Sequence, residues 1–228
     1  MKRMLAISDI HGELAKLTAL LQEANYDPNE DQLILVGDYI DRGPNAREVL
    51  DKVMELQQGG AIVLRGNHEE MLVRAWENRE EAFWQKWTRI NGGDQTLRSY
   101  QVDPNTIFAD VTEEQAAIIQ KHVDYIKSMP AYYETDQYIF VHGGVHPTTP
   151  LAETDPYVLV WIRDEFHNGY NGEKPVIFGH TPTERFHGEG VFEVYFGANN
   201  IIGIDGGAVY GGRLNCLELP SKSIYFIE

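Results

Sequence analysis

Five short apolar runs in this 228-residue chain each lead directly into a cluster of polar residues. The runs occupy residues 4–7, 33–36, 61–64, 138–141 and 176–178. Short continuous runs rich in Val, Ile and Leu are typical of strands buried on both faces, as in sheets covered by helices. Ligands of open α/β sheets bind at the carboxyl ends of the strands, so the pattern constrains both the fold class and the location of a site.

Amphipathic segments separate the first three runs and predict helices that pack on a sheet. The apolar positions at helical spacing are Leu14, Leu17, Leu20, Leu21 and Ala24 in the first segment, and Ala46, Val49, Leu50, Val53 and Met54 in the second. After residue 190 the pattern indicates further strands at 191–195, 201–204, 214–219 and 224–227. The chain therefore begins as β-α-β-α-β and ends in strands.

Residues 70–133 have a different pattern, which is mostly helical and aromatic. Thr112 begins a capping-box sequence, Thr-Glu-Glu-Gln, which predicts the start of a helix over 112–127. We expect a single domain over residues 1–228, with a helical cap subdomain inserted at 70–133. A chain of this length fits one α/β domain better than two full domains.

The charge of the chain excludes some classes of function. The formal net charge is −16, and nucleic acids and anionic membranes both attach through positive surfaces. Cys216 is the single cysteine, so no intramolecular disulfide can form. No segment approaches the roughly 20 apolar residues of a membrane-spanning helix. We expect a cytoplasmic protein that binds neither nucleic acid nor membranes.

The polar clusters contain side chains that can bind metal ions. They are Asp9, His11, Asp38, Asn67, His142 and His180. Oxygen and imidazole ligands without thiolates suit Mn²⁺, Fe or Zn²⁺ better than a cysteine-rich structural zinc site. Six ligands exceed the needs of one tetrahedral ion and fit two ions that share a carboxylate.

Three motifs at these positions resemble the signature motifs of the PPP-type serine/threonine protein phosphatases, in the bacterial and phage branch of the calcineurin-like metallophosphoesterases. They are Asp9-x-His11, Gly37-Asp38-x-x-Asp41-Arg42-Gly43 and Gly66-Asn67-His68-Glu69. His142-Gly143-Gly144 and Gly179-His180 match the later ligand positions, so the resemblance spans residues 5–215. It implies a two-sheet α/β sandwich flanked by helices, with an inserted helical cap.

The resemblance also implies two divalent metal ions, with Mn²⁺ favoured and Fe or Zn²⁺ as alternatives. The first ion is assigned to Asp9, His11 and Asp38. The second ion is assigned to Asp38, Asn67, His142 and His180. Asp38 would bridge the two.

Two further roles follow from the motifs. His68 lies next to a metal ligand and is the expected general acid, and Asp41 can orient its ring through a hydrogen bond. Planar, permanently charged guanidinium groups suit phosphate oxygens. The expected phosphate-binding residues are Arg42, Arg65, Arg163 and Asn67.

The implied activity is hydrolysis of phosphoserine and phosphothreonine proteins, or of small phosphoesters, by in-line attack of a metal-bridging hydroxide. No regulatory subunit is implied. The main alternative is a symmetrical dinucleoside polyphosphate hydrolase, such as a diadenosine tetraphosphatase. Those relatives typically lack the Asp-Arg-Gly ending found here at 41–43, which favours the protein phosphatase. A more remote alternative is a catalytically silent phosphoprotein-binding module, which would have lost a ligand or the general acid.

Two segments outside the motifs have open interpretations. The aromatic group of Trp76, Phe83, Trp84 and Trp87 suits the core of the cap, or else an apolar wall beside the site. The sequence Asn-Gly-Gly-Asp at 91–94 suits a loop that ends a helix, or else a segment near the site.

Overall fold

Two five-stranded mixed sheets form the centre of the computed structural model, which describes residues 2–228. The first sheet has the order β10-β9-β1-β2-β3. Its strands are β1 (Arg3–Ile7), β2 (Asp31–Leu35), β3 (Ile62–Val63), β9 (Leu214–Leu219) and β10 (Ile224–Ile227). β1, β2 and β3 are parallel, whereas β9 and β10 are antiparallel to their neighbours. The three parallel strands therefore end at the same edge of the sheet.

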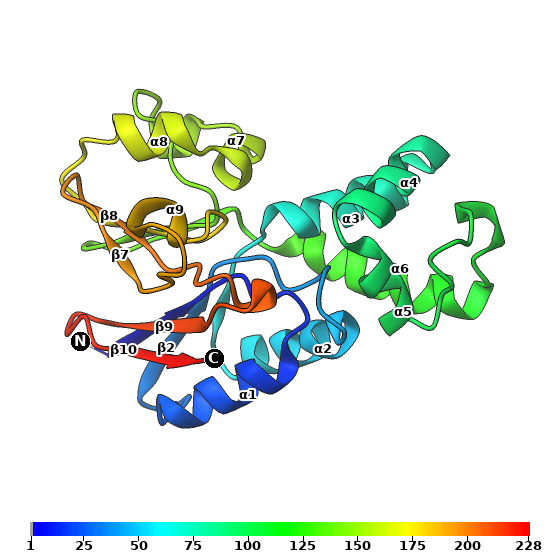
Figure 1. The fold of residues 1–228 in the computed structure, drawn as a ribbon, viewed down its shortest axis with the longest axis horizontal. Coiled ribbons are helices and arrows are strands. Elements are labelled where there is room, and N and C mark those ends of the chain that lie inside the picture. The colour runs from blue at the N-terminus through cyan, green and yellow to red at the C-terminus, as the bar shows by residue number, and fades with distance from the viewer. Residues whose placement is uncertain (1) are drawn as a thin grey trace.

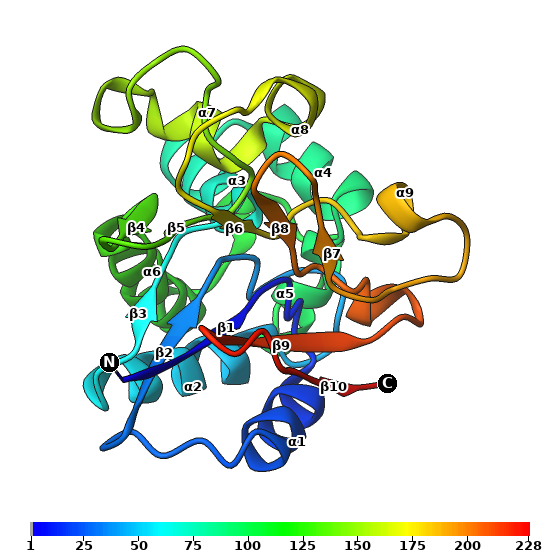
Figure 2. The same cartoon turned by 90° about the vertical axis from the view of Figure 1, so that its left-hand side faces the viewer.

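The second sheet has the order β4-β5-β6-β8-β7. Its strands are β4 (Tyr132–Glu134), β5 (Ile139–Val141), β6 (Val176–Phe178), β7 (Tyr195–Phe196) and β8 (Ile201–Gly203). β5, β6 and β8 are parallel, and β4 and β7 are antiparallel edge strands. The two sheets stack face to face between outer layers of helices (Figure 2). This arrangement confirms the predicted two-sheet α/β sandwich.

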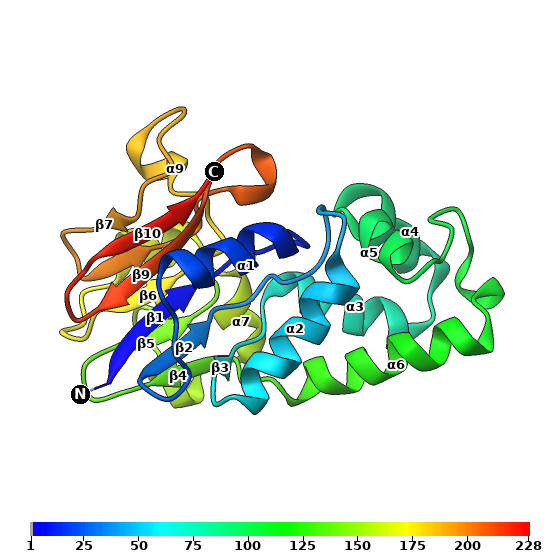
Figure 3. The ribbon, with the colours of Figure 1, turned by 90° about the horizontal axis from the view of Figure 1, so that it is seen from below.

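The alternation of side chains in the central strands explains the layers. Met4 and Ala6 of β1 face the second sheet, where they share one apolar cluster with Phe140, Ile177 and Ile202. The intervening residues of β1 face the opposite way and pack under α1 (Leu14–Glu23) and α2 (Ala46–Gln58). Figure 3 shows these two helices over the first sheet. On the far side, α7 (Pro156–Trp161) and α8 (Asp164–Gly169) cover the second sheet.

A helical region lies between β3 and β4 and extends to one side of the sheets (Figure 1). It contains α3 (Asn67–Asn78), α4 (Glu81–Ile90), α5 (Gly93–Ser99) and α6 (Glu113–Ser128). The Thr112 hydroxyl accepts the backbone N–H of Gln115, so the predicted cap and start of α6 are confirmed. The division at 70–133 stays a prediction.

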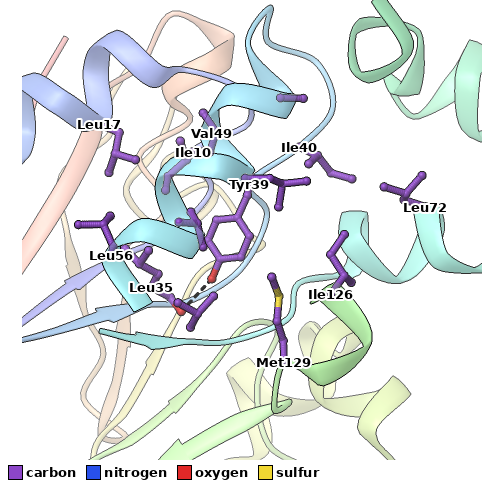
Figure 4. Close-up of a cluster of buried hydrophobic side chains, with 14 of the residues drawn as sticks. Ile10, Leu17, Leu35, Tyr39, Ile40, Val49, Leu56, Leu72, Ile126 and Met129 are labelled. Atoms are coloured by element: carbon purple, nitrogen blue, oxygen red, sulfur yellow. Dashed lines mark hydrogen bonds between the residues drawn. The ribbon is translucent and has the colours of Figure 1, made fainter. Parts of the chain in front are cut away.

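The helical region shares its core with the first sheet. Leu72 of α3 and Ile126 of α6 belong to the same buried cluster as Leu35 and Tyr39 (Figure 4). The Tyr39 hydroxyl donates to the carbonyl oxygens of Leu35 and Leu64, at 3.0 and 2.7 Å, and so satisfies its polar end in an apolar setting. The helices are therefore packed against the elements that carry the motifs.

Two strand assignments differ from the sequence pattern. The run predicted at 191–195 forms a strand only at its last residue, because β7 comprises Tyr195–Phe196. The carbonyl oxygen of Phe192 accepts hydrogen bonds from the side chains of Arg213 and Asn215, so it is not available to a sheet. β4 was not predicted, since its three residues are too few for a periodic signal.

A further short helix, α9 (Glu184–His187), follows β6. Among residues 2–228, none of the helices combines the length and the apolar character that crossing a membrane would need.

Candidate metal centre

Each residue predicted to bind metal follows a strand, and all six side chains are buried. Those from the first sheet are Asp9 and His11 after β1, Asp38 after β2 and Asn67 after β3. Those from the second sheet are His142 after β5 and His180 after β6. Asp9, His11, Asp38 and His180 have φ between 43° and 65°. Positive φ is uncommon for residues other than glycine, and such strain is concentrated at functional sites.

The Asp38 carboxylate lies at the centre of these residues. Its Oδ1 is 3.2 Å from His142 Nε2, and its Oδ2 is 3.5 Å from His11 Nε2. Two groups of three donors could hold a metal ion, and in each group the donor atoms lie within 4.8 Å of one another. The groups are His11, Asp38 and His68, and Asp38, His142 and His180. Asp38 belongs to both, as a bridging ligand would.

Backbone carbonyls fix the orientation of two histidine rings. His11 Nδ1–H donates to the oxygen of Ile40, and His142 Nδ1–H donates to the oxygen of Val36, each at 2.8 Å. A carbonyl only accepts, so Nδ1 carries the hydrogen and Nε2 faces the site, as in histidines that ligate metals. His142 Nε2 lies 2.9 Å from Asn67 Oδ1 and 3.2 Å from Asp38 Oδ1. Such converging acceptors require a proton or a cation among them.

The pKa values reflect this arrangement of acceptors. Burial disfavours a charged His142, yet the Asp38 carboxylate outweighs burial and raises the pKa of His142 to about 9. Burial likewise opposes the Asp38 charge, but His142 and His68 hold the pKa of Asp38 well below its usual range. Burial lowers the pKa of His180, whose Nε2 has no hydrogen-bond partner within residues 2–228. The donor set therefore fits divalent cations.

Asp9 lies at the margin of the six predicted metal ligands. Both of its carboxylate oxygens accept the backbone N–H of His180, at 3.1 and 3.0 Å. Neither three-donor group includes it. Burial raises the pKa of Asp9 to about 6. Asp9 thus links the first and second sheets at the site.

Asp205 is a buried carboxylate that the sequence analysis did not select. It follows β8, and it lines a cavity of about 130 Å³ together with His11, His180, Arg42 and Arg163. Burial raises the pKa of Asp205, and the nearby Asp9 charge raises it further. The sequence did contain a signal that could have identified Asp205. This residue follows the apolar run 201–204, just as the other site residues follow apolar runs.

His68 and Asp41 form the predicted pair. His68 Nδ1–H donates to Asp41 Oδ2 at 2.6 Å, and His68 Nε2 lies 3.9 Å from Asp38 Oδ2. Two residues of the helical region hold Asp41. Trp87 Nε1–H donates to Oδ2 at 2.9 Å, and the Thr96 hydroxyl donates to Oδ1 at 2.6 Å. No local sequence signal predicted these two contacts, because they come from α4 and α5.

Glu69 connects two of the motif loops. Its buried carboxylate accepts the backbone N–H groups of Asp38 and Tyr39, at 2.8 Å each, and that of Gly66 at 2.9 Å. Burial raises the pKa of Glu69 to about 7. A Cβ at Gly66 would collide with Asp38, so glycine permits the close approach of the loops. The last residue of the third motif is therefore structural.

The three predicted phosphate-binding arginines differ in their contacts. Arg42 Nη1–H donates to His11 Nε2 at 2.6 Å, and Arg163 Nη2–H donates to His180 Nδ1 at 3.4 Å. Arg65 instead forms an ion pair with Glu70 at 3.4 Å and does not line the cavity that contains the other two. The structure therefore brings Arg42 and Arg163 together at one cavity and leaves Arg65 outside it.

The segment 91–94, which joins α4 to the first turn of α5, lies beside the site. The carbonyl oxygen of Gly92 accepts the backbone N–H of Arg42 at 2.9 Å. Gly92 has φ of 85°, and a Cβ there would press on Arg42, so glycine suits this position. Both interpretations left open apply to this segment, because Asn91 caps the end of α4 and Gly92 contacts Arg42. For the aromatic group, Trp87 reaches the site, whereas Trp76, Trp84 and Phe108 pack together.

Comparison with known proteins gives one family and several relatives. The family described as calcineurin-like phosphoesterase matches residues 2–211. The chain is 29% identical over 222 residues to "Serine/threonine-protein phosphatase 1" of Salmonella typhimurium, covering 93% of this chain and 90% of the relative. It is 28% identical over 241 residues to "Bis(5'-nucleosyl)-tetraphosphatase PrpE [asymmetrical]" of Anoxybacillus flavithermus, covering 94% and 89%.

A solved structure has the same fold. The crystal structure of a putative diadenosine tetraphosphatase superimposes with a TM-score of 0.71 at 21% identity, covering 99% of this chain and 93% of the other. At this identity the likeness concerns the fold alone.

Proposed function

The chain belongs to the calcineurin-like phosphoesterase family, and we propose that within it the protein is a metal-dependent phosphomonoesterase of phosphoserine and phosphothreonine proteins. Phosphoester hydrolysis is the activity of the family, and the substrate class is the proposal. The observation that most supports metal-dependent phosphoester hydrolysis is the position of His68. Its Nδ1 is held by Asp41, and its Nε2 lies 3.9 Å from the carboxylate at the centre of the donor groups.

We assign the metal ligands as the motifs imply. One ion would be held by Asp9, His11 and Asp38. The other would be held by Asp38, Asn67, His142 and His180. When bound, two divalent ions would supply Lewis acidity at the phosphoryl group and activate water. Imidazole and oxygen donors suit Mn²⁺, Fe or Zn²⁺. The resemblance to the PPP-type phosphatases is what favours Mn²⁺ among them.

The residues of the chain supply the proton and the orientation. His68 would donate a proton from Nε2 to the leaving alkoxide oxygen, because its other nitrogen is fixed by Asp41. Trp87 and Thr96 bind the Asp41 oxygens and so determine the plane of the His68 ring. Arg42 and Arg163 line the cavity beside the donor groups and would bind the phosphate oxygens.

Arg42→Ala is expected to weaken inhibition by inorganic phosphate about 10-fold or more, since it removes charge-assisted hydrogen bonds of about 1.5–3 kcal/mol. Arg65→Ala should have a smaller effect, because Arg65 is already paired with Glu70. The measurement is the phosphate inhibition constant, with the exposed Arg98→Ala as a control. Equal constants for wild type and Arg42→Ala would exclude Arg42 from the phosphate site.

Two substrate classes are compatible with the family. The Asp41-Arg42-Gly43 ending of the second motif and the similarity to a relative named as a serine/threonine phosphatase support the protein phosphatase. The second candidate is hydrolysis of dinucleoside tetraphosphates, which relatives named as tetraphosphatases support. Those relatives are named as asymmetrical enzymes, whereas the alternative expected from the sequence was symmetrical.

A comparison of three substrates tests the proposal. With Mn²⁺ supplied, we expect kcat/KM on a phosphoserine peptide to exceed that on diadenosine tetraphosphate by about tenfold or more, with an aryl phosphate as a reference for bare phosphomonoester chemistry. The reverse order would assign the protein to the second candidate. Its products would then identify the cleavage, since asymmetrical cleavage gives ATP and AMP and symmetrical cleavage gives two ADP. Absence of turnover on all three would favour a silent binding module.

A further inference from the structure

A second cavity, of about 210 Å³, is lined by residues of α3, α4 and α7 and lies beside the candidate metal centre. Helix α7 contacts α3. We call this cavity the Arg74 pocket. Its lining is Met71, Arg74, Phe83, Lys86, Trp87, Asn91, Tyr157 and Trp161. Two bases and no acid line it, in a chain whose net charge is −16. The pocket is therefore a positive region on an acidic protein.

The face of α3 connects this pocket to the donor groups. Asn67, Met71 and Arg74 are spaced i, i+4 and i+7, so they lie along one face of the helix. Asn67 Oδ1 is 2.9 Å from His142 Nε2, whereas Met71 and Arg74 line the pocket. Seven residues of helix correspond to about 10 Å along the axis. The pocket thus lies outward from the centre along α3.

The other two helices repeat this arrangement. On α4, Phe83 and Trp87 are spaced i, i+4, and the inner residue, Trp87, donates to Asp41 at 2.9 Å. On α7, Tyr157 and Trp161 are spaced i, i+4, and the inner Trp161 ring lies 5.9 Å from the His180 ring. On α4 and α7 both the inner and the outer side chain line the pocket, and the inner one also contacts a residue of the site.

The outer residues orient the Arg74 guanidinium. It lies 5.5 Å from the Phe83 ring and 5.8 Å from the Tyr157 ring, within the range of cation–π contacts. Within residues 2–228 neither Arg74 nor Lys86 forms an ion pair, and Trp161 Nε1–H is buried without an acceptor. The aromatic rings contact the guanidinium without using its N–H donors. The pocket consequently offers several donors and two positive charges to an anion.

We propose that the Arg74 pocket is a specificity subsite for an acidic side chain of the phosphoprotein, two or three residues away from the phosphorylated residue. An extended peptide spans about 3.3–3.6 Å per residue, so two or three residues cover the distance along α3 between the site and Arg74. This inference rests on the proposed function, and it names the substrates that the enzyme would prefer.

The test compares phosphoserine peptides that carry Asp or Asn at one position, two or three residues before or after the phosphoserine. Wild type should prefer Asp at one or more of these positions by about 5-fold in kcat/KM, mainly through KM, and added salt should reduce the preference. The double variant Arg74→Gln/Lys86→Gln should bring the ratio near one. Arg79→Gln/Lys121→Gln makes the same change of charge outside the pocket and should retain the preference.

Four results would overturn the inference. Equal rates of the wild type on Asp and Asn peptides at low salt would show that no acidic residue is recognised, while leaving the phosphatase proposal intact. A preference that persists in the pocket variant would place its origin elsewhere. A raised KM for diadenosine tetraphosphate in the pocket variant, with unchanged peptide ratios, would assign the anion to a polyphosphate. Failure to hydrolyse any phosphopeptide would reject the proposed function as well.

Discussion

Asp38→Asn is expected to reduce turnover by at least about 100-fold, more than the loss of a residue that merely supports a metal ligand. Asp38 is the one side chain common to both donor groups, with oxygens 3.2 Å from His142 Nε2 and 3.5 Å from His11 Nε2. Asparagine keeps the shape but removes the charge that two cations would share. The measurement is the steady-state rate over a Mn²⁺ titration, together with the metal content of the purified protein.

The control for this variant is Asp136→Asn, which removes the same charge from an exposed position. In the wild type, exhaustive chelation should abolish activity, and Mn²⁺ should restore at least part of it. Activity that persists after chelation, or an Asp38→Asn protein with full metal content and normal turnover, would reject the dinuclear assignment.

His68→Asn is expected to lower kcat on a phosphoserine peptide by about 10²–10⁴-fold, the usual contribution of a general acid. The serine alkoxide is a poor leaving group and needs the proton that His68 would donate. A nitrophenolate leaves without that help, so the loss on nitrophenyl phosphate should be much smaller. The two kcat values, measured side by side in the variant and the wild type, give the comparison.

Asp41→Asn provides a companion to this experiment. It should show the same dependence on the leaving group with a smaller loss, because the ring of His68 remains but is less well oriented. His187→Asn changes an exposed histidine outside the site and should leave both rates unaltered. If His68→Asn reduced turnover equally on both substrates, His68 would bind or position the phosphate and would not act as a general acid.

The sequence correctly predicted those elements that depend on contacts between residues close together in the chain. The capping box at Thr112 identified the start of α6, because the bonds that cap a helix join residues three apart. The prediction of a strand at 191–195 was wrong because contacts with residues far away in the sequence decide the structure there. Its apolar pattern was suitable, but the side chains of Arg213 and Asn215, 20 residues away or more, bind the carbonyl oxygen of Phe192.

In the candidate site, too, the sequence predicted what depends on neighbouring residues and missed what depends on distant ones. The rule that polar residues follow buried strands selected six donors, and the structure buries all of them at the strand ends. The same rule, applied to the run before Asp205, would have selected that carboxylate as a seventh donor. It could not show that Arg65 pairs with Glu70, since that contact depends on how the two side chains are placed and not on residue type.

The sequence by itself determined the chemistry of this protein: imidazole and oxygen donors at the ends of buried strands, and three arginines suited to phosphate. These are properties of side-chain type and of periodicity over a few residues. Only the tertiary structure decided the distances. The packing of the second sheet on the first brings His142 to one Asp38 oxygen, the pairing of β1 with β2 brings His11 near the other, and the helical region brings Trp87 and Thr96 to Asp41. Contacts between segments tens of residues apart depend on how whole elements pack, which no local pattern encodes.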